Sequence, residues 1–385
     1  MTDRSVLDLA AHRSGGAPTV RRVLVVSAGI GGGHDATARA LVEQVEQAWP
    51  EARLRWVDTL ELLGPRLGPA CRWTYLVNVE RTPWLYDLFY ASLWRHRWFA
   101  EASKRFVGAL VGPRLGTVVA QFPPDLVLST YQFGTAGLVW LRRRGLSAPI
   151  GTWVSDFAPH PFWIYPEIDR NFVVDPSAVA VALAAAPGAA VSVCRPPVSA
   201  RFQPGDRDEA RSCLGLAADR LVVLVACGSY GFGVVEEAVR ALLSLGDAVQ
   251  VVAVCGRNRE LRRRLAAMGE PRRRLLPLGW VDTMPSLLRA ADLVVTNAGG
   301  ATALEAVATR RTVVMYRPIA GHGTANAALM TMAGLAHTCH DAAQLAAFVR
   351  SVLPDRGERC GDGDPHPGGV PGTDGAEAGG ASEIR

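Results

Sequence analysis

Short apolar runs alternate with longer amphipathic segments along most of the chain. The runs are rich in β-branched residues and end at glycine or polar residues, which is typical of parallel strands buried on both faces. These runs are Val23–Ser27, Leu126–Ser129, Gly151–Val154, Leu221–Cys227, Gln250–Cys255, Leu293–Thr296 and Thr312–Tyr316. The alternation predicts an α/β fold with helices on both faces of each sheet.

An apolar run that ends in a glycine cluster occurs twice, over residues 23–33 and again over 221–233. The repetition predicts two Rossmann-like domains with a cleft between them, because one such unit forms half of a nucleotide-binding fold. A proline-rich stretch at 196–204 predicts a linker near residue 200. We therefore expect an N-terminal domain over 21–199 and a C-terminal domain over 200–354.

The two ends of the chain have a different composition. Residues 1–20 are mostly polar with a Gly-Gly-Ala-Pro break, and residues 355–385 are rich in Gly, Pro, Asp and Glu with almost no large apolar side chain. Segments of this kind bury too little apolar surface to offset their loss of chain entropy. Both ends are predicted to be disordered.

An insertion at about 64–114 is unusual for a plain α/β domain because it is rich in aromatic residues. These are Trp73, Tyr75, Trp84, Tyr86, Phe89, Tyr90, Trp94, Trp98, Phe99 and Phe106. Arginines and a lysine lie between them. Aromatic rings mixed with cations suit the headgroup boundary of a lipid bilayer. The alternative is that the rings fill the core of a helical insertion, and the two interpretations are compatible.

The net charge of +5 and the pI of about 9.0 indicate an anionic partner, and most of the basic surplus is Arg. Basic residues do not form long runs and no zinc-finger or helix-turn-helix pattern occurs, so a nucleotide or an anionic membrane surface is favoured over nucleic acid. The seven cysteines lack CxxC spacing and predict reduced thiols. With no signal-like segment, we expect a cytoplasmic protein, peripheral on the cytoplasmic face of the membrane if it binds lipid.

The first glycine cluster, Gly31-Gly32-Gly33-His34, joins a strand to a helix-like segment. Glycines at such a turn let backbone N–H groups approach a ligand at the positive end of the helix. The three glycines are therefore candidates for an acceptor loop. His34, at the mouth of the cleft, is a candidate base for an acceptor hydroxyl. The alternative role for His34 is a hydrogen bond within the turn.

The second cluster, Gly228-Ser229-Tyr230-Gly231, repeats this plan in the C-terminal half. Its backbone amides and the Ser229 hydroxyl are candidates for binding a pyrophosphate. A structural tight turn is the alternative.

The third segment, Thr296–Ala306, is the most specific of the three. Gly299 and Gly300 open a helix, Thr302 lies in its first turn, and Glu305 follows where a carboxylate accepts hydrogen bonds from ribose hydroxyls. Helix capping is the alternative for Glu305. The loop that follows at 318–326 is expected to face the sugar, with His322 in the loop and Asn326 on the next helix.

The chain resembles the family of monogalactosyldiacylglycerol synthases and processive diacylglycerol glucosyltransferases, because four segments occur in the same order in both. These segments are the GGGH cluster, the stretch from Thr152 to Arg170, the GSYGFG turn and the NAGGATALEA helix start. The similarity runs over roughly residues 22–352, and the peptidoglycan lipid-intermediate N-acetylglucosaminyltransferase is a more distant relative. The resemblance implies a GT-B fold, an acceptor bound by the N-terminal domain, a UDP-sugar bound by the C-terminal domain, and inversion at the anomeric carbon.

The resemblance also implies roles for individual residues. His34 matches the family's candidate base, and Asp156 is expected to orient that base or to act in its place. Gly299, Gly300 and Thr302 match diphosphate contacts, Glu305 the ribose carboxylate, and Asn326 the asparagine after the sugar loop. The chain departs from the family at Gly321-His322-Gly323, where Gly-Gln-Glu is usual, and this leaves the donor sugar open.

No metal or cofactor is expected. The DxD-like triplet Asp206-Arg207-Asp208 lies in the presumed linker and is interpreted as the start of a solvated helix. Backbone amides and helix dipoles are expected to stabilise the departing diphosphate in place of a cation.

The resulting prediction is an inverting, metal-independent glycosyltransferase that moves a sugar from a UDP-sugar to a hydroxyl acceptor, a diacylglycerol-type lipid. The main alternative is a tailoring glycosyltransferase of antibiotic biosynthesis, for example of a nucleoside, with an unusual or amino UDP-sugar and a soluble acceptor. Two further alternatives are a UDP-sugar epimerase and a non-enzymatic sensor of nucleotide sugars.

Overall fold

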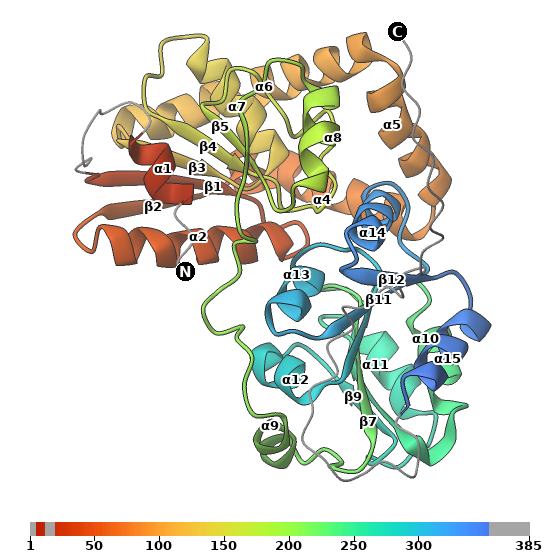
Figure 1. The fold of residues 1–385 in the computed structure, drawn as a ribbon. Helices are drawn as coiled ribbons and strands as arrows, with labels where there is room; N and C mark the ends of the chain where they lie inside the picture. The colour runs from red at the N-terminus through yellow and green to blue at the C-terminus, as the bar shows by residue number, and fades with distance from the viewer. Residues whose placement is uncertain (1–4, 12–19, 354–385) are drawn as a thin grey trace, which may run out of the picture.

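The computed structural model describes residues 5–11 and 20–353 and contains two parallel sheets of six strands each (Figure 1). Helices cover both faces of each sheet, so the predicted pair of Rossmann-like domains is confirmed. The helices are α1 Ser5–Ala11, α2 Gly33–Ala48, α3 Thr59–Leu62, α4 Gly64–Glu80, α5 Pro83–Arg95, α6 Arg97–Gln121, α7 Gln132–Arg142, α8 Ser177–Ala185, α9 Arg207–Leu214, α10 Val235–Leu243, α11 Arg259–Ala266, α12 Met284–Ala290, α13 Ala301–Ala308, α14 His322–Met332 and α15 Ala342–Ser351.

The N-terminal sheet has the strand order β2-β1-β3-β4-β5-β6. Its strands are β1 Arg22–Ser27, β2 Arg53–Asp58, β3 Leu126–Ser129, β4 Ile150–Trp153, β5 Arg170–Val173 and β6 Val191–Val193. The central strands β1, β3 and β4 are almost wholly buried, in keeping with their continuous apolar sequence. The chain passes from β1 outward to β2 and then back past β1 to β3, so the loop that follows β1 opens at the topological switch point of the sheet's carboxyl edge.

The C-terminal sheet has the order β12-β11-β10-β7-β8-β9. Its strands are β7 Leu221–Ala226, β8 Val249–Val254, β9 Leu275–Leu278, β10 Leu293–Thr296, β11 Thr312–Tyr316 and β12 Ala336–Cys339. Helix α13 follows the central strand β10, and α14 follows β11 on one side of it. The loop after β9 opens at the same carboxyl edge, but β7 and β8 separate it from β10.

Part of the predicted N-terminal disorder is wrong. Residues 5–11 form α1, in which Val6 and Leu9 are buried against the N-terminal sheet. The Trp153 indole nitrogen donates a hydrogen bond to Ser5 Oγ at 3.2 Å. The spacing of three residues places Val6 and Leu9 on one helix face, which supplies enough apolar burial to order a short segment. The rest of the predicted disorder, in 1–4, 12–19 and 355–385, lies outside the described residues.

The insertion at 64–114 is helical and consists of α4, α5 and most of α6. In Figure 1 these helices extend from the N-terminal domain toward α14 of the C-terminal domain. Some of its aromatic rings pack inward, whereas others are exposed, including Trp98 and Phe106 at 71% each and Trp84 at 66%. The core and surface interpretations therefore each hold for part of the aromatic set.

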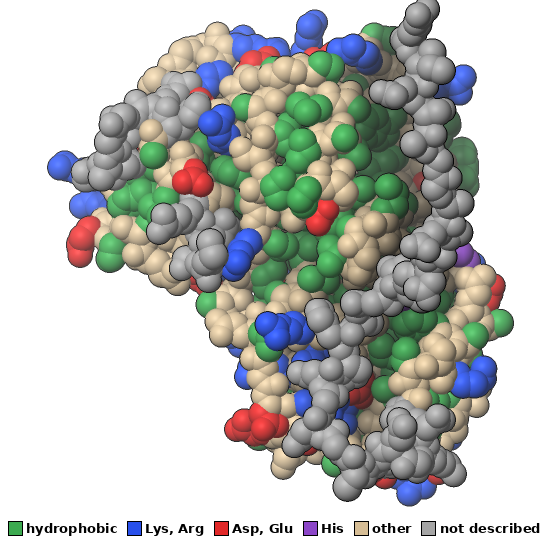
Figure 2. Space-filling model, viewed as in Figure 1, with side chains coloured by type: hydrophobic (Ala, Val, Ile, Leu, Met, Phe, Trp, Pro, Cys, Tyr) green, Lys and Arg blue, Asp and Glu red, His purple; other side chains and the backbone are tan. Residues whose placement is uncertain are grey.

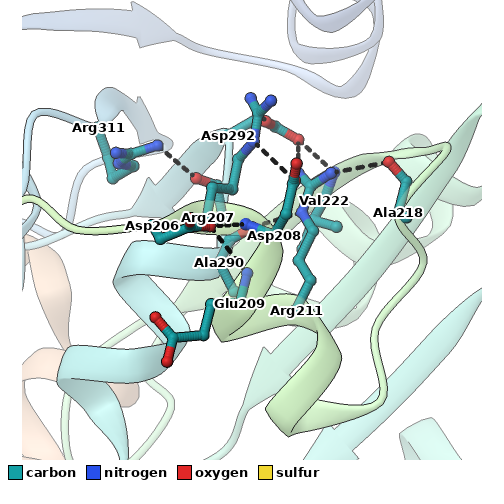
Figure 3. A network of polar contacts seen from close by, with 11 residues as sticks. Asp206, Arg207, Asp208, Glu209, Arg211, Ala218, Val222, Ala290, Asp292 and Arg311 are labelled. Atoms are coloured by element: carbon teal, nitrogen blue, oxygen red, sulfur yellow. Dashed lines mark hydrogen bonds and ion pairs between the residues drawn. The ribbon is translucent and has the colours of Figure 1, made fainter.

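The segment between β6 and α9 connects the two sheets, and the DxD-like triplet lies at its end. Asp206 is the N-cap of α9, and its side chain accepts hydrogen bonds from the Asp208 and Glu209 backbone nitrogens. Arg207 and Arg211 both pair with Asp292 (Figure 3). The triplet is an exposed helix start, as predicted, within a network that fastens α9 to the start of β10.

Candidate functional site

Three glycine turns from the two sheets meet between the domains. The Ser229 hydroxyl, after β7, donates a hydrogen bond to the Gly31 carbonyl at 2.7 Å. A Cβ atom built on Gly33, at the start of α2, would lie 3.7 Å from Cβ of Ala301 at the start of α13. The N-terminal ends of α2 and α13 therefore face each other across the interface.

His34, in the first turn of α2, has one ring nitrogen held by the backbone. Its Nδ1 lies 2.9 Å from the Thr130 carbonyl oxygen. A carbonyl only accepts hydrogen bonds, so this contact assigns the hydrogen to Nδ1 and leaves a lone pair on Nε2. Burial lowers the pKa of His34, although Asp156 and the Thr130 carbonyl oppose the shift. The ring is therefore neutral near pH 7 and has a free basic nitrogen.

Asp156 follows β4 and lies close to three histidines. Its carboxylate accepts a hydrogen bond from the Trp163 indole at 3.0 Å, and the Trp163 ring lies 5.7 Å from the His34 ring. Burial raises the pKa of Asp156, but the charges of His322, His34 and His160 and the indole hydrogen bond outweigh it, so the net pKa is lowered. Asp156 stays ionised and acts on His34 through its charge, whereas the hydrogen bond that orients His34 comes from Thr130.

The N-terminus of α13 is suited to an anion. Its N-cap is Gly300, no side chain caps it, and no acidic residue lies in its first turn, which includes Thr302. The preceding Gly299 has φ +68°, and a Cβ there would lie 2.6 Å from Cβ of Asn326. The turn therefore requires glycine, and the backbone N–H groups that it leaves at the helix start are available to a phosphate.

Glu305 lies one turn further along α13. Burial raises its pKa to about 7. No side-chain hydrogen bond or ion pair of Glu305 occurs within the described residues. The side chain is half-buried, so its carboxylate loses part of its hydration, and hydroxyl groups of a ligand would replace the lost hydrogen bonds.

Asn326, on α14, is fully buried at the domain interface. Its Oδ1 accepts a hydrogen bond from the Ala158 backbone nitrogen at 2.7 Å, and its Nδ2 donates to the Ala298 carbonyl at 2.8 Å and to Asp156 at 3.5 Å. In this arrangement its polar atoms connect the two domains. Its predicted contact with the donor stays a prediction.

The two domains each match a known protein family. The Monogalactosyldiacylglycerol (MGDG) synthase family matches residues 34–198, and the Glycosyltransferase family 28 C-terminal domain matches residues 222–353. The chain is a glycosyltransferase of the MGDG synthase and family 28 group. The first match begins at His34, and the second includes the α13 turn and the α14 loop.

Curated relatives of this glycosyltransferase include the processive diacylglycerol beta-glucosyltransferases of Bacillus cereus (strain AH187) and Bacillus anthracis (strain CDC 684 / NRRL 3495). Each is 26% identical over 347 residues, which cover 87% of this chain and 86% of the relative. At this level of identity the sugar and the acceptor of the relatives remain properties of those proteins.

Solved structures support the GT-B fold. MurG of Acinetobacter baumannii is 17% identical with a TM-score of 0.53, and the match covers 87% of this chain and 91% of MurG. The spinosyn rhamnosyltransferase SpnG is 14% identical with a TM-score of 0.55, covering 87% and 92%. These likenesses show the architecture of the glycosyltransferase and nothing about its ligands.

Sequence reasoning missed several residues of the interdomain site. Thr130 positions His34, and Trp163 positions Asp156. Of these two, only Thr130 had a sequence signal, because it directly follows the predicted strand Leu126–Ser129. Trp280 follows β9 and is 54% exposed, with the Arg257 guanidinium 4.8 Å from the centre of its ring. An exposed tryptophan at the carboxyl edge of a parallel sheet is a signal for ligand binding that the sequence contained.

Within residues 5–11 and 20–353, no group of three or more His, Cys, Asp or Glu side chains is placed to hold a metal ion. None of the helices described there is long and apolar enough to cross a membrane.

Proposed function

We propose that this glycosyltransferase moves a sugar from a UDP-sugar to a hydroxyl group of a diacylglycerol-type lipid, with inversion and without a metal ion. The observation that carries the proposal is the His34 ring, which Thr130 holds through Nδ1 in the first turn of α2, the helix whose start faces the start of α13. The names of the curated relatives and the match to the MGDG synthase family support the acceptor class.

The donor is expected to bind along the carboxyl edge of the C-terminal sheet. The uncapped N-terminus of α13 binds the diphosphate, and Glu305 accepts hydrogen bonds from the ribose hydroxyls. Trp280 and Arg257, after β9 and β8, offer a stacking surface for the base. The sugar then lies on the other side of α13, near the α14 loop, which follows β11.

The chemical step follows from this placement. The acceptor hydroxyl loses its proton to His34 Nε2 as its oxygen bonds to the anomeric carbon from the face opposite the diphosphate. The bond from the anomeric carbon to the diphosphate oxygen breaks, and its electron pair stays on the diphosphate. Asp156 stabilises the imidazolium that forms, and the α13 amides stabilise the departing anion. Attack from the opposite face inverts the configuration.

The exposed side of the helical insertion supports a lipid acceptor. Trp73, Trp84, Trp98 and Phe106 are each at least 65% exposed. The basic side chains between them are also exposed; these are Arg81, Arg95, Arg97 and Arg105. Figure 2 shows apolar side chains along the upper right margin, where Figure 1 places α5, and Lys and Arg side chains along the top. Rings and cations together suit an anionic bilayer surface.

The test is UDP release from a panel of UDP-sugars, with a chelator present throughout and with or without vesicles that contain diacylglycerol and anionic phospholipid. The expected result is release that depends on vesicles and yields a glycolipid whose anomeric configuration, read by NMR, is opposite to that of the donor. Retention of configuration or loss of turnover in chelator would overturn the mechanism. Turnover of a soluble acceptor without vesicles would instead favour the tailoring function.

A further inference from the structure

Helix α14 begins at the sugar side of the donor site, but its first turn is held by the other domain. Its N-cap, Gly321, supplies no side-chain hydrogen bond. The Gly321 N–H instead donates to the Asp87 carboxylate of α5 at 2.6 Å. An acidic side chain at a helix N-terminus is electrostatically favourable. Asp87 therefore caps α14 from the N-terminal domain, 234 residues away in sequence.

A second contact joins the residues adjacent to this pair, Tyr86 of α5 and His322 of α14. The Tyr86 hydroxyl lies 3.2 Å from Nδ1 of His322, and the two rings are perpendicular with centres 5.9 Å apart. Tyr75, from α4, also lies beside the His322 ring, at 6.5 Å. The approach is close, since a Cβ on Gly321 would lie 2.6 Å from Cε1 of Tyr86. These contacts fix both the position and the orientation of the His322 imidazole.

In the Gly321-His322-Gly323 turn, His322 is the residue that carries a side chain. Gly323 has no room for a side chain, because a Cβ there would lie 2.5 Å from Ile319 Cγ1 and 3.0 Å from the Asn297 carbonyl oxygen. Asn326, one turn further along α14, donates a hydrogen bond to Asp156 at 3.5 Å, so the start of this helix lies beside the groups that face the acceptor. The base-stacking candidate Trp280 follows β9, at the opposite edge of the sheet. His322 is thus at the sugar end of the donor and away from the nucleotide end.

We propose that α5 of the insertion completes the donor-sugar site, with Tyr86 and Asp87 as positioning residues that hold His322 against the sugar of the nucleotide sugar. The inference rests on the proposed function, since it assumes a nucleotide-sugar donor. It adds that an element of the acceptor domain controls sugar recognition, whereas nucleotide recognition belongs to the C-terminal domain alone. A merely structural contact between domains would weaken the binding of UDP and UDP-sugar alike.

The experiment compares dissociation constants for UDP and for the best UDP-sugar, measured by calorimetry on the full chain. Tyr86→Phe keeps the ring and removes the hydroxyl, so UDP-sugar binding should weaken about 3- to 10-fold while UDP binding stays within about twofold of the wild type. Asp87→Ala should weaken UDP-sugar binding by about tenfold or more, and Asp87→Asn, which can still accept a hydrogen bond, should restore part of it. Glu80→Gln is the control, since it changes an exposed acid on the neighbouring helix α4.

A double-mutant cycle makes the test specific. If Tyr86 acts through His322, adding Tyr86→Phe to His322→Ala should cause no further loss in UDP-sugar binding. Equal losses for UDP and UDP-sugar, or additive losses in the double variant, would overturn the inference. The failure of the proposed function looks different, because the wild-type chain itself would then bind neither UDP nor any UDP-sugar.

Discussion

The turn that opens α2 and the turn that opens α13 share the order strand, glycine turn and helix but differ in charge. Each follows a central parallel strand, each has a glycine N-cap, and neither is capped by a side chain. The α2 turn has Asp35 in its first turn and gives its Gly29 N–H to Asp58 at 2.8 Å, whereas the α13 turn has no acid in its first turn. Two acids disfavour an anion at α2, so of the two turns only α13 is prepared for a diphosphate.

Burial shifts the pKa of one side chain near each turn, and both shifts favour the neutral form. It lowers the pKa of His34 and raises the pKa of Glu305 to about 7, so each group moves toward its neutral form. For His34 this produces a free base. For Glu305 it leaves a carboxylate that gains most from a ligand's hydroxyl groups. One physical effect therefore suits the first turn to proton transfer and the second to ligand binding.

The largest expected effect separates catalysis from binding. His34→Ala should lower kcat by about 10²- to 10⁴-fold, the usual contribution of a general base, and leave the UDP dissociation constant unchanged. Steady-state UDP release and calorimetry measure the two quantities. The exposed His340, changed to Ala, is the matched control. Full turnover in His34→Ala would show that the α2 turn has no catalytic base.

The next effect concerns the α13 side. On the proposed donor placement, Glu305→Ala would remove the acceptor of two ribose hydrogen bonds, each made to a charged group, and should weaken UDP binding by about 10- to 100-fold. The loss of affinity should require the ribose of the nucleotide, which inorganic diphosphate lacks. We expect the same variant to bind inorganic diphosphate as the wild type does, and an equal loss for diphosphate would place Glu305 in a structural role.

A change of charge at each turn gives a smaller effect and tests the comparison directly. Ala301→Asp places a negative charge at the α13 N-terminus and should weaken UDP binding by about 3- to 30-fold at low salt. Asp35→Asn removes a charge from the α2 turn and should leave UDP binding unchanged. If the second variant improved UDP binding as much as the first weakened it, both turns would share the diphosphate.

The smallest effect is a dependence on pH. Donor hydroxyls bind the ionised carboxylate of Glu305, whose pKa of about 7 in the free protein means that protonation competes with binding as the pH falls. UDP-sugar affinity should therefore be constant above pH 8 and fall by about tenfold toward pH 6. A UDP-sugar is preferred to UDP here because its diphosphate does not titrate in this range. The dependence should vanish in Glu305→Gln, and its persistence would assign it to another group.

The sequence predicted much of the fold because the central strands are continuous apolar runs. All seven predicted strands occur, with ends shifted by at most one residue. The five strands that were not named are β2, β5, β6, β9 and β12. These are short or contain polar residues, as in Arg53–Asp58, where alternation with Arg hides the pattern.

The site was predictable only where a turn has a glycine signature. His34, Gly299 and Gly300 stand in glycine turns after an apolar run, and the structure brings the starts of α2 and α13 to one interface. Glu305 follows one turn further along α13. The contacts that depend on the packing of one domain on the other were not predictable. Ser229 bonds to Gly31 and Asn326 to Ala158, and nothing in the local sequence of these residues specifies a partner in the other domain.

Helix α1 has a consequence for how the chain is made. Ser5 and Trp153, joined by a hydrogen bond, are 148 residues apart in sequence, and Leu9 lies against the position where Gly151 would have a Cβ, at 2.6 Å. At about 5–20 residues per second, a ribosome completes Trp153 roughly 7 to 30 seconds after Ser5. Helix α1 must therefore wait for a strand that is synthesised much later before its apolar face is covered. A purification tag that pins this segment elsewhere would delay or weaken the closure of the N-terminal sheet.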